Sequence, residues 1–168
     1  MNGRAAVVSL HIAFAGAAPV ISLGEIQAIA GKGLEGDRYY LSTGTYSKTR
    51  GTGREVTMIE IEAIEALGRE YQIDIDAAQA RRNIVTRGVA LNHLIDREFT
   101  VGEAVLRGTR LCEPCAHLEK LTAKGVMRGL VHRGGLRADV VRGGTIRVGD
   151  TITVTSEKIV PVSPSANG

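Results

Sequence analysis

The sequence predicts one compact, mainly β domain with a few short helices. The chain has 168 residues and 21 glycines, and short apolar runs alternate with polar residues at the two-residue period of a half-buried strand. Aromatic residues are scarce, with no Trp, two Phe and four Tyr, so Val, Ile, Leu and Ala must form the core. We expect a single domain over residues 1–158 and a flexible C-terminal tail over residues 159–168.

The strands are expected where this alternation is clearest. They fall at residues 7–14, 26–30, 55–58, 83–85, 99–102, 104–111, 138–142, 145–148 and 151–155. Two glycine-containing turns, Gly143–Gly144 and Gly149–Asp150, predict hairpins between the last three strands.

The helices and loops are read from the remaining segments. Residues 60–69 place Ile61, Ile64 and Leu67 on one helical face. Shorter helical segments are expected at residues 77–81, 116–121 and 126–130. The stretch 41–53 is polar and rich in Ser, Thr and Gly, so we expect a long loop of the kind that often serves function.

The composition favours a small anionic ligand over nucleic acid. The net charge is +3, and most of the basic residues are arginines, whose guanidinium groups bind phosphate or carboxylate through paired hydrogen bonds. No strong basic stripe or set of stacking aromatics indicates a nucleic-acid partner. No apolar run reaches transmembrane length, and two cysteines do not form a disulfide scaffold. We therefore expect a cytoplasmic protein that does not bind membranes, and the sequence predicts no oligomeric state.

Both cysteines lie in the segment Cys112-Glu113-Pro114-Cys115, which follows an expected strand and is interpreted as a tight turn. Two such thiols could be buried apolar residues, a redox dithiol, metal ligands or sulfur carriers. Structural zinc needs four ligands, and the spacing to His117 and His132 matches no zinc-finger pattern. A dithiol of the thioredoxin kind lacks its βαβ context. A soft-metal ligand or a sulfur carrier needs only one of the cysteines at the mouth of an anion-binding cleft.

Other candidate residues surround possible anion sites. Arg81 and Asn83 offer guanidinium and amide groups that suit a phosphate and a heterocycle edge, although exposed arginines are common. Arg38 follows Asp37 in a glycine-paced turn whose backbone amides could bind an anion, or which is simply a structural turn. The pair His132 and Arg133 offers an acid or base near neutral pH, or an ordinary surface loop.

Taken in order, six short motifs resemble the MOSC domain, named for the C-terminal part of molybdenum cofactor sulfurases. Each motif is weak alone, but their order is specific, and together they cover roughly residues 5–155. The motifs are residues 33–38, 54–59, 81–85, 99–104, 111–115 and 144–150.

The resemblance implies a fold and a cofactor. The fold is a closed, irregular MOSC-type β-barrel with a few short packed helices, and the cofactor is a pterin-bound molybdenum. Cys115 falls where the family's molybdenum ligand lies, and Cys112 is its neighbour. Arg81 and Asn83 fall on positions that hold the cofactor, and Arg38, Arg133 and Cys112 are expected to assist.

The resemblance also implies an activity, because relatives reduce N-hydroxylated compounds. This chain has neither a pyridoxal-dependent desulfurase nor a ferredoxin-type cysteine cluster, so a reductase would need electrons from an external donor protein. Asp37 or His132 could supply the proton to a small-molecule substrate, and the 41–53 loop could close over it. The alternative is a non-enzymatic cofactor-binding module or a carrier that holds sulfur from a sulfur donor as a Cys115 persulfide.

Overall fold

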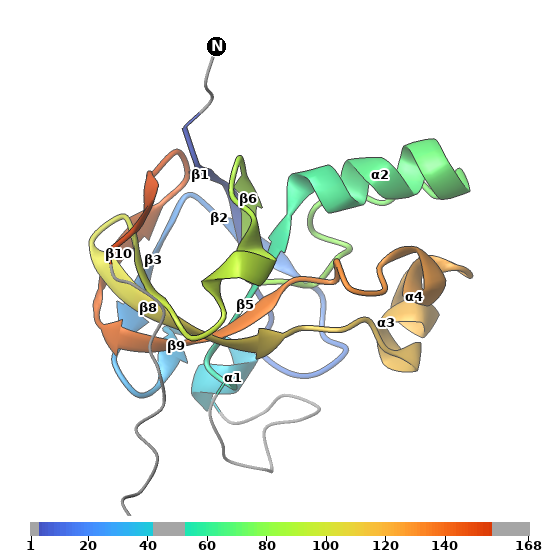
Figure 1. The fold of residues 1–168 in the computed structure, drawn as a ribbon. Coiled ribbons are helices and arrows are strands. Elements are labelled where there is room, and N and C mark those ends of the chain that lie inside the picture. The colour runs from blue at the N-terminus through green and yellow to red at the C-terminus, as the bar shows by residue number, and fades with distance from the viewer. Residues whose placement is uncertain (1–3, 42–52, 156–168) are drawn as a thin grey trace, which may run out of the picture.

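The computed structural model describes residues 4–41 and 53–155 (Figure 1). The strands are β1 (Ala6–Ile12), β2 (Ile21–Leu23), β3 (Glu25–Ile29), β4 (Gly33–Leu34), β5 (Val56–Glu60), β6 (Ile84–Arg87), β7 (Glu98–Val101), β8 (Ala104–Leu111), β9 (Leu136–Arg142), β10 (Gly144–Arg147) and β11 (Ile152–Val154). The helices are α1 (Arg38–Leu41), α2 (Ile61–Tyr71), α3 (Ala116–Leu121) and α4 (Val126–Gly129), with a 3-10 helix η1 (Leu91–Leu94). The expected tail at 159–168 and the interior of the expected 41–53 loop lie outside the described residues.

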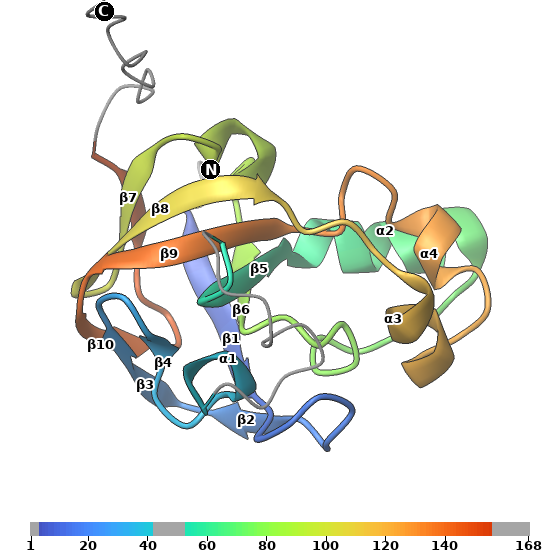
Figure 2. The same ribbon diagram turned by 90° about the horizontal axis from the view of Figure 1, so that it is seen from below.

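The strands form two sheets that curve around a common interior (Figures 1 and 2). The larger sheet has the order β11-β7-β8-β9-β5-β6-β1-β2, and the smaller has the order β10-β3-β4. Among these pairs β5 and β6 run parallel, and the others run antiparallel. The expectation of a mainly β protein with few helices is therefore confirmed.

The expected closed barrel is wrong for the described part of the chain, because β11 and β2, the end strands of the larger sheet, do not pair with each other. A single bridge between Ala6 and Thr151 brings β1 close to the segment before β11. There the backbone of Val7 exchanges hydrogen bonds with the turn at Gly149 and Asp150, at 2.8 and 2.9 Å. A turn occupies this edge where a closed barrel would need a strand-to-strand ladder.

The two hairpins expected near the C-terminus are also wrong. β10 pairs with β3 rather than β9, and β11 pairs with β7 rather than β10. The glycines between β9 and β10 allow close backbone approach, because a Cβ at Gly143 would lie 2.6 Å from the carbonyl oxygen of Ala28. A Cβ at Gly144 would similarly lie 2.7 Å from the carbonyl oxygen of Glu103. These glycines fit the chain into the smaller sheet instead of reversing it in a tight turn.

Two apolar clusters hold the fold together. The larger lies between the two sheets and includes Leu10, Met58, Phe99 and Leu106, all of them fully buried or nearly so. The smaller lies where α2, α3 and α4 gather at one end of the larger sheet. The helix α2 buries Ala63, Ile64, Ala66 and Leu67, as its sequence period predicts. β8 and β9 extend toward this helical end, and the segment with the two cysteines leads from β8 into α3 (Figure 2).

Most expected elements are confirmed within a few residues, including α3 over its whole length. The segment expected to be helical at 77–81 is instead a turn, which ends at Arg81 with a positive φ of 57°. The strand β2 was not expected, because its three residues are too few for a period to be seen. None of the described helices has the length and apolar character needed to cross a lipid bilayer.

Candidate functional site

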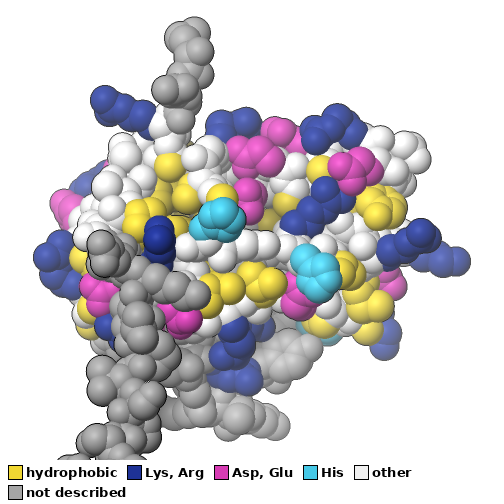
Figure 3. Space-filling view, viewed as in Figure 1, with side chains coloured by type: hydrophobic (Ala, Val, Ile, Leu, Met, Phe, Trp, Pro, Cys, Tyr) yellow, Lys and Arg dark blue, Asp and Glu magenta, His cyan; other side chains and the backbone are white. Residues whose placement is uncertain are grey.

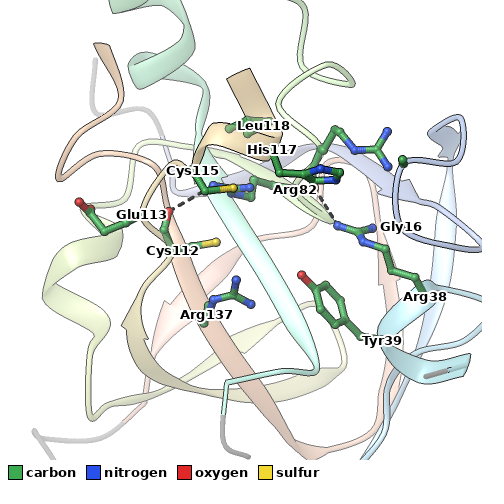
Figure 4. Close-up of a pocket in the computed structure, with 12 residues that line it drawn as sticks. Gly16, Arg38, Tyr39, Arg82, Cys112, Glu113, Cys115, His117, Leu118 and Arg137 are labelled. Carbon is green, nitrogen blue, oxygen red and sulfur yellow. Dashed lines mark hydrogen bonds between the residues drawn. The ribbon is translucent and has the colours of Figure 1, made fainter. Parts of the chain in front are cut away.

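A pocket opens where the ends of β8 and β9 meet α1 and α3 (Figure 4). Residues from five separate segments line it, and four of the predicted site residues are among them: Cys112, Cys115, Arg38 and Arg81. The lining also includes Arg82, Arg137, Tyr39, His117, Glu113, Leu118, Gly16 and Ala17. Sites far apart in the sequence thus meet in one cavity that combines two thiols with several guanidinium groups.

The interpretation of the segment from Cys112 to Cys115 as a tight turn is wrong, since no turn or bend is assigned between β8 and α3. Cys115 itself has extended backbone angles, with φ −134° and ψ 168°. Both cysteines face the pocket, as Figure 4 shows.

The two thiols differ in their access to solvent. Cys112 is 1% exposed, whereas Cys115 is half-buried, and neither forms a disulfide. Cys115 lies directly before α3, and its backbone carbonyl accepts a hydrogen bond from the amide of Glu119. Of the two sulfurs, that of Cys115 is the more available to a ligand that enters from solvent.

Arg82 holds the cysteine segment in place. Its Nε donates to the carbonyl of Gly134 at 2.9 Å, and its Nη2 donates to the carbonyl of Cys112 at 3.2 Å. The amide of Cys112 in turn donates to the carbonyl of Gly135 at 2.8 Å. A Cβ at position 134 would lie 2.5 Å from the Cys112 carbonyl oxygen, so the close packing requires glycine there. Arg82 thus has a structural task, because its donors are directed at backbone carbonyls.

Arg81 has a different environment from its neighbour. Its Nη2 is buried and has no hydrogen-bond partner among the residues that the structure describes. Burial, and secondly the charge of Arg38, lower the pKa of Arg81, while Asp37 and Tyr39 act in the opposite direction. A buried guanidinium nitrogen without a partner is costly, and an anion bound in the pocket would remove that cost.

Asp37 is fully buried and does not line the pocket. Its carboxylate accepts hydrogen bonds from the amides of Ala13 and Tyr39, at 3.1 and 3.3 Å, and pairs with the Arg38 guanidinium at 3.2 Å. Arg38 also donates from Nη2 to the carbonyl of Arg81 at 3.1 Å. Asp37 therefore orients the turn before α1 and the side chain of Arg38.

Asn83, predicted to bind the cofactor, is buried behind the pocket rather than in its lining. Its Oδ1 accepts hydrogen bonds from the backbone and side chain of Thr57, at 3.0 and 3.1 Å. Its Nδ2 donates to the carbonyl of His11 at 3.1 Å. These bonds tie β1, β5 and the start of β6 together, and so fix the backbone that carries Arg81 and Arg82.

His132 and Arg133 also lie outside the pocket lining. The side chain of His132 is 80% exposed and approaches the carboxylate of Glu113 at 3.6 Å. Arg133 donates to the carbonyl of Gly129 at 2.8 Å and pairs with Glu70 at 2.7 Å. Neither side chain is placed to reach a ligand held between the cysteines and Arg81.

Eight residues of the lining were not selected from the sequence, and they include Tyr39, Arg82, His117 and Arg137. Arg82 lies in the motif 81–85, but no signal separated it or Arg137 from ordinary surface arginines. Tyr39 and His117 are each within two residues of a selected position, Arg38 and Cys115. Their proximity along the chain was the signal that could have found them.

The pocket can bind an anion and offer a thiolate. Near its edge, burial first, and then the charges of Arg137 and Arg54, lower the pKa of Arg110, which indicates a crowded positive field. Within the described residues, no group of three or more His, Cys, Asp or Glu side chains could hold a bare metal ion. These donors fit a ligand that brings its own negative groups and accepts one sulfur from the protein.

The fold and the pocket thus define a small, curved β protein with an arginine-lined thiol site. The family model of the MOSC domain matches residues 45–153, and the chain belongs to this family.

Solved structures share the fold. The YuaD protein from Bacillus subtilis is 20% identical, with a TM-score of 0.75 over 94% of this chain and 100% of that chain. YiiM from Geobacillus stearothermophilus is 12% identical, with a TM-score of 0.70 over 90% of this chain and 75% of that chain. YiiM from Escherichia coli is 19% identical, with a TM-score of 0.64 and coverage of 92% and 71%. The comparison with curated protein sequences found no match.

Proposed function

We propose that this protein binds the molybdenum cofactor in the arginine-lined pocket, with the Cys115 thiolate as the protein ligand of molybdenum. We further propose that it reduces N-hydroxylated compounds with electrons from an external donor protein. Membership of the MOSC family supports the cofactor. The observation that carries the proposal is the buried Nη2 of Arg81, which has no partner and lines the same pocket as a half-buried thiol.

The donor set fits the cofactor's chemical groups. A phosphate and a pterin present oxygen and nitrogen acceptors, for which Arg81, Arg38 and Arg137 offer guanidinium donors. Cys115 offers a soft thiolate of the kind that molybdenum accepts. When bound, the cofactor supplies two-electron chemistry with exchange of an oxygen atom.

Three further residues hold other parts of the site in position. Arg82 holds the cysteine segment through two backbone carbonyls, and Asn83 ties together the strands behind it. Asp37 fixes the position of Arg38. We therefore propose that Asp37, Arg82 and Asn83 serve the site by holding other groups, and that Arg133 and His132 are outside it.

We propose that the electrons come from another protein, because the two cysteines of this sequence are too few for a four-cysteine iron–sulfur cluster. We place the protein in the cytoplasm, where reducing conditions keep both thiols reduced.

A second candidate function is a sulfur carrier that holds a persulfide on Cys115. The half-buried position of this thiol favours it, since a donor could reach the sulfur and nearby arginines would stabilise the persulfide anion. Because Cys112 is buried, a carrier would release its sulfur to an outside acceptor rather than to Cys112.

The test is the molybdenum and pterin content of protein made in a cofactor-competent host, together with turnover of an N-hydroxy compound with an artificial electron donor. Wild-type protein and Cys112→Ser should contain stoichiometric molybdenum, and Cys115→Ser should lose it. Wild-type protein that is free of metal but carries a reducible extra sulfur on Cys115 would replace the proposal with the carrier function.

A further inference from the structure

The hydroxyl group of Tyr39 lies on the side of the pocket opposite the cysteines. Tyr39 belongs to α1, and Figure 4 shows its hydroxyl pointing into the cavity, toward the space between the Arg38 guanidinium and the two sulfurs. The ring is half-buried. A ligand that contacts Cys115 from inside the pocket would therefore share the cavity with this hydroxyl.

The position of the ring is fixed by two contacts. The Arg38 guanidinium lies over it, with the Cζ atom 4.8 Å from the ring centroid. The backbone amide of Tyr39 donates to the Oδ2 of the fully buried Asp37 at 3.3 Å. A cation over an aromatic face and a buried carboxylate behind the backbone hold the phenol in one orientation. A phenol that is already held in one orientation loses little conformational entropy when a ligand binds.

The other polar groups of the pocket suit other tasks. Its arginines are permanently charged and match phosphate or the cofactor's ring edge. Arg82 is engaged with backbone carbonyls, and Asp37 does not reach the lining. The phenol of Tyr39 is a hydrogen-bond donor without a formal charge, and it suits the neutral oxygen of an N–OH group, which gives a guanidinium no negative charge to pair with.

We propose that the Tyr39 hydroxyl donates a hydrogen bond to the oxygen of the substrate's N–OH group and so positions that oxygen for removal. The inference rests on the function proposed above. The overall reaction is R–NH–OH + 2 e⁻ + 2 H⁺ → R–NH₂ + H₂O: the N–O bond breaks, a new N–H bond forms, and the oxygen leaves as water. The electrons come from the external donor protein and the protons from solvent, while the tyrosine keeps its own proton.

The test compares Tyr39→Phe with Tyr40→Phe, which is a matched control in the same helix. Tyr40 approaches Lys32, whose Nζ lies 5.7 Å from the ring centroid, and it does not line the pocket. Loss of a hydrogen bond that positions the reacting atom should lower kcat/KM for benzhydroxamic acid by about 10- to 100-fold in Tyr39→Phe. Molybdenum content should equal that of wild type, and Tyr40→Phe should retain wild-type kinetics.

A binding measurement separates hydrogen bonding from general damage to the site. Calorimetric titration of the oxidised, loaded protein should show Tyr39→Phe weakening the binding of benzhydroxamic acid, while benzamide, which lacks the hydroxyl oxygen, binds as to wild type. Equal loss for both ligands, loss of molybdenum, or unchanged kinetics in Tyr39→Phe would overturn the role of Tyr39 alone. Wild-type protein without molybdenum or turnover would instead overturn the proposed function.

Discussion

Two polar regions on β9 each bring side chains of like charge close together, and they relieve the repulsion in different ways. At Arg137, the pocket gathers several guanidinium groups, and burial together with Arg38 lowers the pKa of Arg81. Two residues further along the strand, Asp139 meets the carboxyl group of Glu55, whose pKa is raised to about 8 by burial, by their hydrogen bond and by the charge of Asp139. The carboxyl pair relieves its repulsion by keeping one proton.

The arginines cannot relieve their repulsion through a change of protonation. A guanidinium keeps its proton at any physiological pH, so an anion from outside would be needed to relieve the repulsion around Arg81 and to give its Nη2 a partner. The carboxyl pair relieves its charge repulsion internally, and Asp139 also accepts a hydrogen bond from the amide of Gly53 at 2.7 Å. One oxygen of the pair, the Oε1 of Glu55, is also buried without a partner among the described residues, but a neutral carboxyl carries no net charge that needs a counterion. The difference in charge supports the proposal that the arginine pocket is the functional site.

The largest expected effect is on stability, and it comes from Arg82, whose guanidinium already donates to two backbone carbonyls. Arg82→Met should lower the free energy of unfolding by roughly 3 kcal/mol, because two buried carbonyls lose charge-assisted hydrogen bonds. Urea unfolding measures this loss. Arg133→Met, which removes a more exposed pair with Glu70, should cost less than about 1 kcal/mol. Equal losses in the two variants would contradict the structural role of Arg82.

The next effect is a loss of anion affinity in an Arg81 variant whose free energy of unfolding does not fall. Arg81→Gln should weaken the binding of inorganic phosphate or molybdate to the cofactor-free protein about tenfold or more, since one buried donor is lost. The free energy of unfolding should stay the same or rise, because repulsion from Arg38 is removed. Calorimetry at low salt is the measurement, with the exposed Arg142→Gln as control. Unchanged affinity in Arg81→Gln would contradict the interpretation of the arginine pocket as an anion site.

The carboxyl pair predicts a pH dependence with a definite sign. In the unfolded chain Glu55 loses its proton near its ordinary pKa of 4.5, whereas in the folded protein it keeps it to about pH 8. The folded state therefore binds more protons between these values, and stability should fall as the pH rises from 4.5 to 8. Because the side chain is half-buried, solvent screening should limit the loss of unfolding free energy over this pH range to about 2 kcal/mol.

Glu55→Gln keeps a hydrogen-bond donor for Asp139 but cannot ionise, so it should flatten this slope. Thermal unfolding followed at several pH values measures the change. Glu65→Gln, which alters an exposed pair with Arg87, should keep the wild-type slope. A slope in Glu55→Gln equal to that of wild type would show that the proton is not held by this pair.

The smallest effect is expected at His132. Its side chain is 80% exposed and meets only a partly exposed Glu113, so His132→Gln should change stability by less than about 0.5 kcal/mol. Phosphate binding and turnover should also be unchanged. Urea unfolding and steady-state kinetics check this, and a clear loss of turnover would return His132 to the site.

The sequence period was enough to find most of the strands and α3, because apolar alternation follows directly from which face is buried. It could not find the pairing of β10 with β3, since that contact joins residues far apart along the chain. It could not show that no turn lies between Cys112 and Cys115, because Pro114 is compatible with both turns and extended backbone.

The structure brings two predicted site residues, Cys115 and Arg81, into one pocket, and their roles there remain predictions. Other predicted residues have suitable chemistry but do not line this pocket. Asn83 has the right amide group for a cofactor, yet both of its polar atoms are used to join β1 and β5. Arg81 and Arg82 are adjacent and chemically identical, and only their contacts tell a ligand-binding arginine from a structural one.

The central claim is that this pocket offers one protein sulfur, from Cys115, to the molybdenum of a bound cofactor. X-ray absorption spectroscopy at the molybdenum edge tests it most directly, on wild-type protein and on Cys115→Ser and Cys112→Ser reconstituted with the cofactor. The account predicts one sulfur neighbour fewer around molybdenum in Cys115→Ser, and a spectrum like that of wild type in Cys112→Ser. An unchanged sulfur count in Cys115→Ser, or loss of a sulfur in Cys112→Ser, would contradict it.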